Sequence, residues 1–518
     1  MRTIGGLALL GILAPVAVCR GESPEAVGHP AAALYRVEEV SLGPIPARIV
    51  GTVVSEDGCH IAFVGAKGDK WCVVIDGQAG LEYEGIFGIF GLVFSLDWKR
   101  AAHVTAVTAM GEKFCVVIDG QKGPEYDRIG AGSLRFSPDG KRVAYAASKG
   151  HMRHFVVIDG QEGPEYDTIG KGSLIFSPDG KRVAYAAFRA VYGAPGGGKW
   201  FVVIDGQAGP EYDEIVNVSL AFSPDGKRVA YVAEKGGRQF VVFDSEAGPE
   251  YDGILEGTPV FSPDWKRVAY GAAKGDQWCI VIDGQAGPAY DGITEGSLVF
   301  GPDGKRVLYA AQKGDKGFVV IDGQAGPQYD GIGAGSLPFG PDRRRSAFAT
   351  RKGKKWCAII GGPERPTYDK VAGGSLVFGP DGKRVMYAAR KGDKWFVVLD
   401  GEAGPEYDEI LEGTPVFSPD GKRVTYGAGK GRKRFVVLDG QEGMAYDGIR
   451  NLVFSPDGKR VAYSAQKASK ALLVIDGQPV SEYDGVLSGP VFRPDGTLEY
   501  LAVRARTLFR VKHVPVEK

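Results

Sequence analysis

Residues 133–168 read SLRFSPDGKRVAYAASKGHMRHFVVIDGQEGPEYDT, and residues 375–409 read SLVFGPDGKRVMYAARKGDKWFVVLDGEAGPEYDE. The two segments are copies of one unit. The aspartate of its first tight turn recurs in twelve copies between Asp57 and Asp495, most often 39 residues apart. Self-similarity at such a period is the signature of a repeat architecture. The sequence therefore predicts one array of twelve repeats over residues 33–514, not the separate domains that its length would suggest.

Each repeat contains four short extended runs. The first ends at a Pro-Asp-Gly turn, and the second is the Arg-Val-Ala-Tyr run. In the repeat that begins at Ser375, the third run is Trp395–Leu399 and the fourth is Glu406–Ile410. Short β-branched and aromatic runs bounded by Gly or Asp-Gly predict an antiparallel meander. A repeated four-stranded sheet of this length is typical of a β-propeller blade, whereas a linear β-solenoid usually has shorter rungs. We predict an all-β fold, a β-propeller of about twelve four-stranded antiparallel blades.

The ends of the array suggest how it closes. The last repeat, built by residues 488–514, supplies three strands, and residues 33–40 have the character of the missing fourth. We expect the strand at 33–40 to complete that blade. Common propellers have four to eight blades, which favours two six-bladed rings. The junction between the sixth and seventh repeats, Tyr290–Phe300, has the same length as its neighbours, so we prefer a single large ring.

Composition excludes several classes of function. The chain has 63 Lys and Arg against 63 Asp and Glu, so no bulk positive charge favours nucleic acid. Its 78 glycines suit many tight turns. The six cysteines include four at one repeated position where other copies carry Phe, which indicates small core residues and no disulfide framework. No nucleophile elbow, phosphate-binding loop or calcium-loop pattern is present, so we expect no catalytic residue, no bound metal and no cofactor.

The first residues have the pattern of an export signal. A basic start is followed by the apolar run Ile4–Val18, which is shorter than a membrane span. We predict a signal peptide at 1–21, a linker at 22–32 and a short tail at 515–518. The protein is then periplasmic or extracellular, with no transmembrane segment. Cys19 raises lipidation as an alternative, although Val18 stands where that signal prefers a smaller residue.

The motif Phe-Ser-Pro-Asp-Gly-Lys-Arg-Val-Ala-Tyr, at residues 136–145, 176–185 and 454–463, resembles the WD40-like repeat of TolB-type periplasmic propellers. The resemblance spans about residues 47–505. It implies a propeller fold in an exported protein. It does not fix a function, because that repeat serves translocation partners, peptidase gating domains and other exported proteins.

Residues that depart from the repeat are the best site candidates, because repetition serves folding. Six of them replace the usual Gly or Ala in the segments between blades. A large insertion, Phe188–Lys199, contains Tyr192, and two histidines lie in the corresponding turn of the preceding repeat as a weak His-x-x-His metal pattern. The candidate binding residues on the loop face are Lys171, Asn217, Glu256, Glu295, Glu412, Asn451, His151, His154 and Tyr192.

These observations favour a non-catalytic, monomeric binding scaffold. Its partner on the loop face would be a protein or an envelope polysaccharide, and nucleic acid is not expected. Lysines of the Lys-Gly turns would add positive charge to that face, although such residues are commonly just solvated. The alternative is a propeller lyase or glycosidase acting on an anionic polysaccharide, with Glu256, Glu295 and Glu412 as its acids and bases.

Overall fold

The computed structural model describes residues 35–45, 48–55, 58–67, 70–83, 91–107, 113–150, 153–191, 197–216, 219–333, 339–341, 345–361 and 366–516. The predicted signal peptide and linker lie outside these residues. The described residues form twelve antiparallel sheets and contain no α-helix. The fold is therefore all-β, and the sheets are the blades of a β-propeller, as predicted. The chain divides into two compact units, Met1–Glu82 with Tyr407–Lys518 (unit 1) and Tyr83–Glu406 (unit 2).

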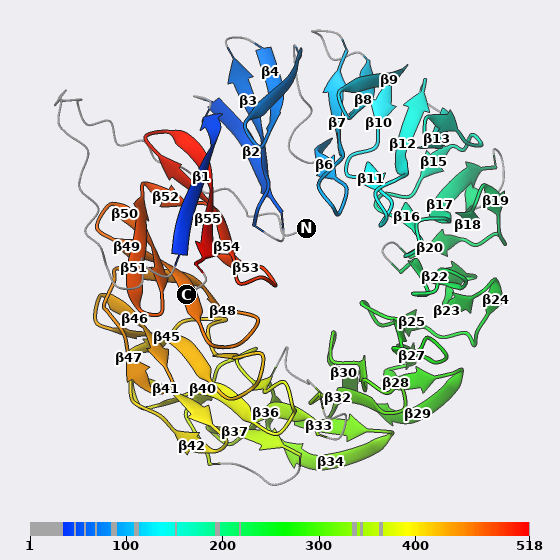
Figure 1. Ribbon diagram of the computed structural model, residues 1–518. Coiled ribbons are helices and arrows are strands. Elements are labelled where there is room, and N and C mark those ends of the chain that lie inside the picture. Colours follow the sequence, from blue (N-terminus) through cyan, green and yellow to red (C-terminus); the bar gives the residue numbers. More distant parts are fainter. Residues whose placement is uncertain are drawn as a thin grey trace. The chain divides into compact units, whose positions relative to one another are not determined.

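Unit 2 contains blades 2 to 9, which follow one another in chain order (Figure 1). The strands are, in blade 2, β6 (Val93–Phe94), β7 (Ala101–Ala106), β8 (Phe114–Ile118) and β9 (Gln121–Tyr126); in blade 3, β10 (Arg128–Ile129), β11 (Arg135–Phe136), β12 (Val143–Lys149), β13 (Arg153–Ile158) and β14 (Gln161–Glu162); in blade 4, β15 (Thr168–Ile169), β16 (Ile175–Phe176), β17 (Val183–Ala190), β18 (Gly198–Ile204) and β19 (Gln207–Ala208); in blade 5, β20 (Glu214–Ile215), β21 (Ala221–Phe222), β22 (Val229–Lys235), β23 (Arg238–Phe243) and β24 (Glu246–Ala247); in blade 6, β25 (Gly253–Ile254), β26 (Val260–Phe261), β27 (Val268–Lys274), β28 (Gln277–Ile282) and β29 (Gln285–Tyr290); in blade 7, β30 (Gly292–Ile293), β31 (Val299–Phe300), β32 (Val307–Lys313), β33 (Lys316–Ile321) and β34 (Gln324–Tyr329); in blade 8, β35 (Gly331–Ile332), β36 (Ala347–Lys352) and β37 (Lys355–Ile360); and in blade 9, β38 (Lys370–Val371), β39 (Val377–Phe378), β40 (Val385–Lys391), β41 (Lys394–Leu399) and β42 (Glu402–Ala403).

Unit 1 contains blades 10, 11, 12 and 1, and it joins the two ends of the chain. The strands are, in blade 10, β43 (Glu409–Ile410), β44 (Val416–Phe417), β45 (Val424–Lys430), β46 (Lys433–Leu438) and β47 (Gln441–Glu442); in blade 11, β48 (Gly448–Phe454), β49 (Val461–Lys467), β50 (Lys470–Ile475) and β51 (Gln478–Tyr483); in blade 12, β52 (Gly485–Val486), β53 (Val491–Phe492), β54 (Leu498–Arg504), β55 (Thr507–Pro515) and β1 (Tyr35–Pro44); and in blade 1, β2 (Arg48–Val54), β3 (Ile61–Lys67), β4 (Lys70–Ile75) and β5 (Gln78–Tyr83).

The N-terminal strand β1 belongs to blade 12, where it lies beside β55 (Figure 1). The two strands are antiparallel, from the pair Tyr35–Pro515 to the pair Pro44–Thr507. Blade 12 thus combines residues from both ends of the sequence. The two units hold eight and four blades, and blades 6 and 7 lie together in unit 2, so the chain does not divide into two groups of six.

The core lies between neighbouring blades. Val202 of blade 4 packs with Val229, Tyr231 and Phe240 of blade 5, and all four are buried. The second and third strands of each blade carry apolar residues on both faces because each sheet is covered on both sides. First strands of neighbouring blades also contact one another, as β6 does β11 and β26 does β31. The first strands therefore mark the edge at which the blades of unit 2 converge.

The structure divides the predicted fourth run, Glu406–Ile410, between two blades. The outer strand β42 ends before it, and Glu409–Ile410 forms β43, which pairs with β45 in blade 10. Asp408 marks the change of sheet, because its carboxylate accepts the amide of Gly431 (2.6 Å) in the Lys-Gly turn of blade 10. The sequence prediction was wrong here because one extended run contains a crossing from sheet to sheet.

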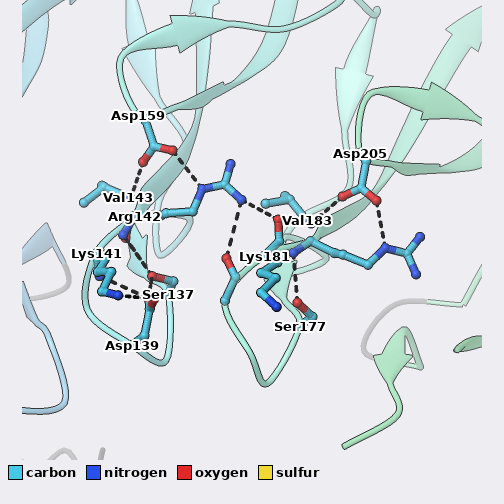
Figure 2. A network of polar contacts seen from close by, with 12 residues as sticks. Ser137, Asp139, Lys141, Arg142, Val143, Asp159, Ser177, Lys181, Val183 and Asp205 are labelled. Carbon is cyan, nitrogen blue, oxygen red and sulfur yellow. Dashed lines mark hydrogen bonds and ion pairs between the residues drawn. The ribbon is translucent and has the colours of Figure 1, made fainter. Parts of the chain in front are cut away.

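The repeated polar motif joins successive blades (Figure 2). In blade 3 the Ser137 hydroxyl donates to Asp139 (2.6 Å) and accepts the amide of Arg142 (2.9 Å). The guanidinium of Arg142 then donates to Asp159 (2.8 Å) and to the carbonyl of Lys181 in blade 4 (2.6 Å). We call this blade-to-blade bond the arginine staple. It recurs at Arg100, Arg182, Arg267 and Arg423.

The staple predicts a local loss of order when it is removed. Lys cannot make the two-sided contact of Arg142. Arg142→Lys should therefore destabilise the next turn by about 1.5 kcal/mol, the lower end of the contribution of a hydrogen bond to a charged group, because Arg142 is partly exposed. Amide hydrogen exchange should become several-fold faster at residues 177–182. The control is Arg228→Lys, because Arg228 bonds Asp244 in its own blade and makes no bond to blade 6 in the described structure. Equal exchange in the two variants would contradict the staple.

Candidate functional site

The first strand of most blades is divided by a short bulge. In blade 7 the bulge separates β30 from β31, and it is held to β32 at both ends. Thr294 donates its amide to the carbonyl of Ala310 (2.9 Å), while the Ser297 hydroxyl donates to the carbonyl of Thr294 (2.5 Å) and accepts the amide of Ala310 (3.0 Å). The bulge is therefore a fixed frame that presents its tip residue, Glu295.

The same frame recurs along the converging edge of unit 2. Ser173 holds the bulge of blade 4 through Gly170 (2.7 Å) and Ala186 (3.0 Å), and Thr258 bonds Leu255 (2.5 Å) in blade 6. The hydroxyl of Ser or Thr in the frame is kept, whereas the tip residue and the residue before it change from blade to blade. The tips, all exposed, are Ala131, Lys171, Glu256, Glu295 and Gly373 in unit 2, and Glu412 in unit 1.

The tip residues do not lie between blades, where the sequence analysis had placed them. Each comes after the chain has already joined the new sheet, because the two-residue strand before the bulge pairs with the second strand of that sheet. Lys171, Glu256 and Glu295 share the converging edge of unit 2, and Glu412 lies in the corresponding bulge of unit 1. Asn451 interrupts β48 of unit 1, where the register shifts between Arg450 and Val453. Its φ of 56° marks the kink.

The remaining candidates do not assemble into a site in the described structure. His151, Tyr192 and Asn217 lie outside the described residues. His154 is half-buried in β13, where its amide donates to the carbonyl of Tyr166 (2.9 Å). Across the described residues, no group of three His, Cys, Asp or Glu side chains is placed to hold a metal ion. The same part of the chain contains no helix with the length and apolar character to cross a bilayer.

The lysines of the Lys-Gly turns are partly neutralised by carboxylates on their own face. Lys149 pairs with Glu162 (2.7 Å), and Lys316 pairs with Asp330 (2.6 Å). In unit 1, Lys430 pairs with Glu442 (2.6 Å) and Lys433 with Asp447 (2.6 Å). These pairs reduce the positive electrostatic potential of that face, which weakens the case for binding an anionic polymer there. The bulge tips are the better candidates for a binding site.

A cleft of about 450 Å³ lies between blades 6 and 7 of unit 2. Ile280, Ile282 and Tyr309 line it with apolar surface, and Arg267 lies at its polar side. The Arg267 guanidinium already donates to Asp283 (2.8 Å) and to the carbonyl of Lys305 (2.8 Å). The guanidinium of Arg267 is thus already engaged in the arginine staple between the two blades.

Sequence reasoning missed a buried ionic cluster where blade 12 meets blade 1 in unit 1. Glu499 accepts hydrogen bonds from Arg493 (2.6 Å), Lys512 (2.7 Å) and the Cys59 thiol (3.0 Å). Its side chain is only 8% exposed. Burial raises the pKa of Glu499, but the bonds from Cys59, Lys512 and Arg493 outweigh it and bring the pKa to about 2. We call these four residues the Glu499 cluster.

At this junction of blades 12 and 1, which we call the seam of unit 1, other contacts take the place of the arginine staple. The turn of blade 12 is one residue shorter than in the other repeats and lacks the usual arginine, and Arg510 on β55 takes its place. Its guanidinium donates to the carbonyl of Cys59 (2.7 Å) and pairs with Asp76 (2.8 Å) in blade 1. The signal in the sequence was the loss of repeat residues: Cys59 and His60 stand where most copies have Lys-Arg.

A second polar network ties β1 to blades 11 and 12, with Tyr483, Tyr500 and His513 buried and the Glu39–Arg504 pair at the surface. Tyr483 donates to Glu39 on β1 (2.5 Å), and Glu39 also pairs with Arg504 (2.7 Å). The Tyr500 hydroxyl lies 3.1 Å from Nε2 of His513. Burial lowers the pKa of His513 to about 4, so this imidazole is neutral near pH 7.

No protein-family model and no curated protein sequence matches the chain. Solved structures with similar folds include a eukaryotic initiation factor (14% identity, 64% of this chain and 92% of that one, TM-score 0.33), the Dos1 propeller (12%, 56% and 90%, 0.29) and the β-propeller domain of the Trilobed protease from Pyrococcus furiosus (16%, 55% and 98%, 0.25). The assignment of the fold rests on the strand pairing of the chain itself.

Proposed function

We propose that this protein is an exported, non-catalytic and monomeric scaffold of the TolB-type class that binds a protein partner along its first-strand bulges. One observation carries the proposal: the bulge frame is the same from blade to blade, while its exposed tip residue varies. A fixed backbone with variable side chains suits recognition, since rigid presentation lowers the entropic cost of binding. Export rests on the sequence pattern of residues 1–21.

The tip residues make this proposal testable. Lys171, Glu256 and Glu295 are exposed on one edge of unit 2, so replacing all three by Ala should weaken partner binding at least tenfold while leaving the melting temperature unchanged. Capture from an envelope extract, read by mass spectrometry and then by titration of the captured protein, measures the effect. Tip residues that are mere solvated surface would leave capture intact.

A matched control uses the outer strands of the same unit. Glu246, Gln285 and Gln324 are exposed on β24, β29 and β34, so their triple Ala variant changes a similar amount of surface elsewhere. It should capture the partner as the native protein does. Equal loss in both variants would contradict recognition by the tips, and turnover of an anionic polysaccharide that is lost in Glu295→Gln would replace the scaffold proposal by the glycosidase alternative.

A further inference from the structure

Two tryptophans occupy a turn position that most repeats give to glycine. In nine repeats the residue after the turn aspartate is Gly, with φ between 68° and 83°. At the same position Trp98 has φ of 56° and Trp265 has φ of 53°. Bulky residues rarely adopt this left-handed conformation, because their Cβ crowds the backbone. The turn itself needs no side chain there, so the indoles serve another purpose.

Trp265 of blade 6 replaces a glycine that packs closely against the preceding turn in other blades. A Cβ on Gly304, the residue at this position in blade 7, would lie 3.0 Å from Asp264 of the preceding turn, so glycine permits close packing of the turns. The arginine staple is missing at the junction of blades 5 and 6 in the described structure. Arg228 instead lies over the ring of Phe243, 3.6 Å from its centroid.

Aromatic residues gather at this junction. Trp265 stacks on Phe261 with 4.2 Å between the ring centroids and 14° between the planes, and Phe261 in turn stacks on Phe243 at 6.0 Å. Most other repeats have Ile or Leu at the position of Phe243. In blade 2, Trp98 stacks on Phe94 in the same way, at 4.1 Å and 9°. Trp98 and Trp265 are both half-exposed, so each indole offers surface to solvent.

We infer that the Phe261–Trp265 stack is a binding platform for a neutral pyranose unit of a glycan. The face of an indole is electron-rich, and the C–H bonds on the apolar face of a pyranose ring complement it. Exposed Asp264 and Lys266 flank the indole with opposite charges and can bond ring hydroxyls, which favours a neutral sugar over an anionic one. This platform is separate from the bulge tips and does not depend on their partner.

The test replaces Trp265 by glycine, which is the residue that most repeats have at this position. Native protein and Trp265→Gly are run by affinity electrophoresis in gels containing laminarin, dextran or hydroxyethyl cellulose. We expect the native protein to be retarded in at least one gel and Trp265→Gly to bind that polysaccharide at least fivefold more weakly, with Trp265→Phe intermediate. The melting temperature of Trp265→Gly should stay the same or rise, because glycine fits this φ better.

Control variants make every outcome decisive. Trp395→Phe changes a half-buried tryptophan within β41, away from the turns that follow the first strands, and should be retarded like the native protein. The triple bulge-tip variant should also be retarded normally, whereas Trp265→Gly should still capture the protein partner. Absence of retardation in all three gels, unchanged retardation of Trp265→Gly or a lower melting temperature of that variant would each overturn the platform; the last would make Trp265 a structural residue.

Discussion

A chain that starts at Ile45, without β1, is expected to melt about 10 °C below the full chain in its unit 1 transition. The strand β1 contributes two buried side chains, Tyr35 and Leu42, and such residues stabilise a fold by about 2 kcal/mol each. It also supplies Glu39, which bonds both Tyr483 and Arg504. For a cooperative unit of this size, a loss of about 4 kcal/mol corresponds to a shift of roughly 8–16 °C.

Complementation separates the loss of β1 from a general effect of truncation. A synthetic peptide of residues 33–44, added in excess, should restore part of the lost melting temperature by pairing with β55. Glu39→Ala in the full chain should give a smaller loss, because the strand and its buried side chains remain. A truncated chain that melts like the native protein, or a peptide with no effect, would contradict the closure of blade 12 by β1.

The sequence predicts the blades well because each one repeats the same local signals. Alternating β-branched runs and Asp-Gly turns determine the second and third strands almost completely. The sequence did not predict the boundary between the fourth strand of one blade and the first strand of the next. No glycine or proline interrupts the run Glu406–Ile410, and the change of sheet depends on a long-range bond from Asp408 to Gly431.

Residues at the bulge tips could be identified from the sequence, but the Glu499 cluster could not. Variation within a repeat identified Lys171, Glu256 and Glu295, although their position inside the first strand needed the pairing pattern. The Glu499 cluster unites Cys59 with Glu499, which are 440 residues apart. Only the pairing of the two chain ends brings them together, so no local pattern could have revealed the contact.

Replacing Glu499 by Ala is expected to destabilise unit 1 by about 3 kcal/mol. Removing one partner of a buried ionic group leaves the others without compensation, which costs about 3–5 kcal/mol when burial is complete. Arg493 and Lys512 are about one third exposed, so the lower end applies. Urea unfolding with a pulse of deuterium labelling, read on peptides of β54 and β55, measures unit 1 separately. A neutral result would contradict the cluster.

The repeat itself provides the matched control. Glu499 and Lys512 face each other across β54 and β55 at the position where blade 3 has Ala144 and Ile158. The triple variant Arg493→Ser, Glu499→Ala, Lys512→Ile restores the apolar pair and the turn serine. It should recover most of the lost stability, because no charge is left uncompensated in the seam. A triple variant as unstable as Glu499→Ala would show that the cost came from lost packing.

The pH dependence distinguishes Glu499 from His513, because these two groups titrate in different ranges. The pKa of Glu499 is about 2 in the fold and 4.5 as a free side chain, so its contribution is complete above pH 4.5 and is lost as the pH falls toward 2. The pKa of His513 is about 4 in the fold against 6.5 when free. The unfolded chain therefore takes up a proton there first, and stability falls between pH 6.5 and 4. His513→Gln should flatten the upper range and Glu499→Ala the lower one. Curves that change in the opposite ranges would contradict these assignments, since each variant removes only its own titrating group.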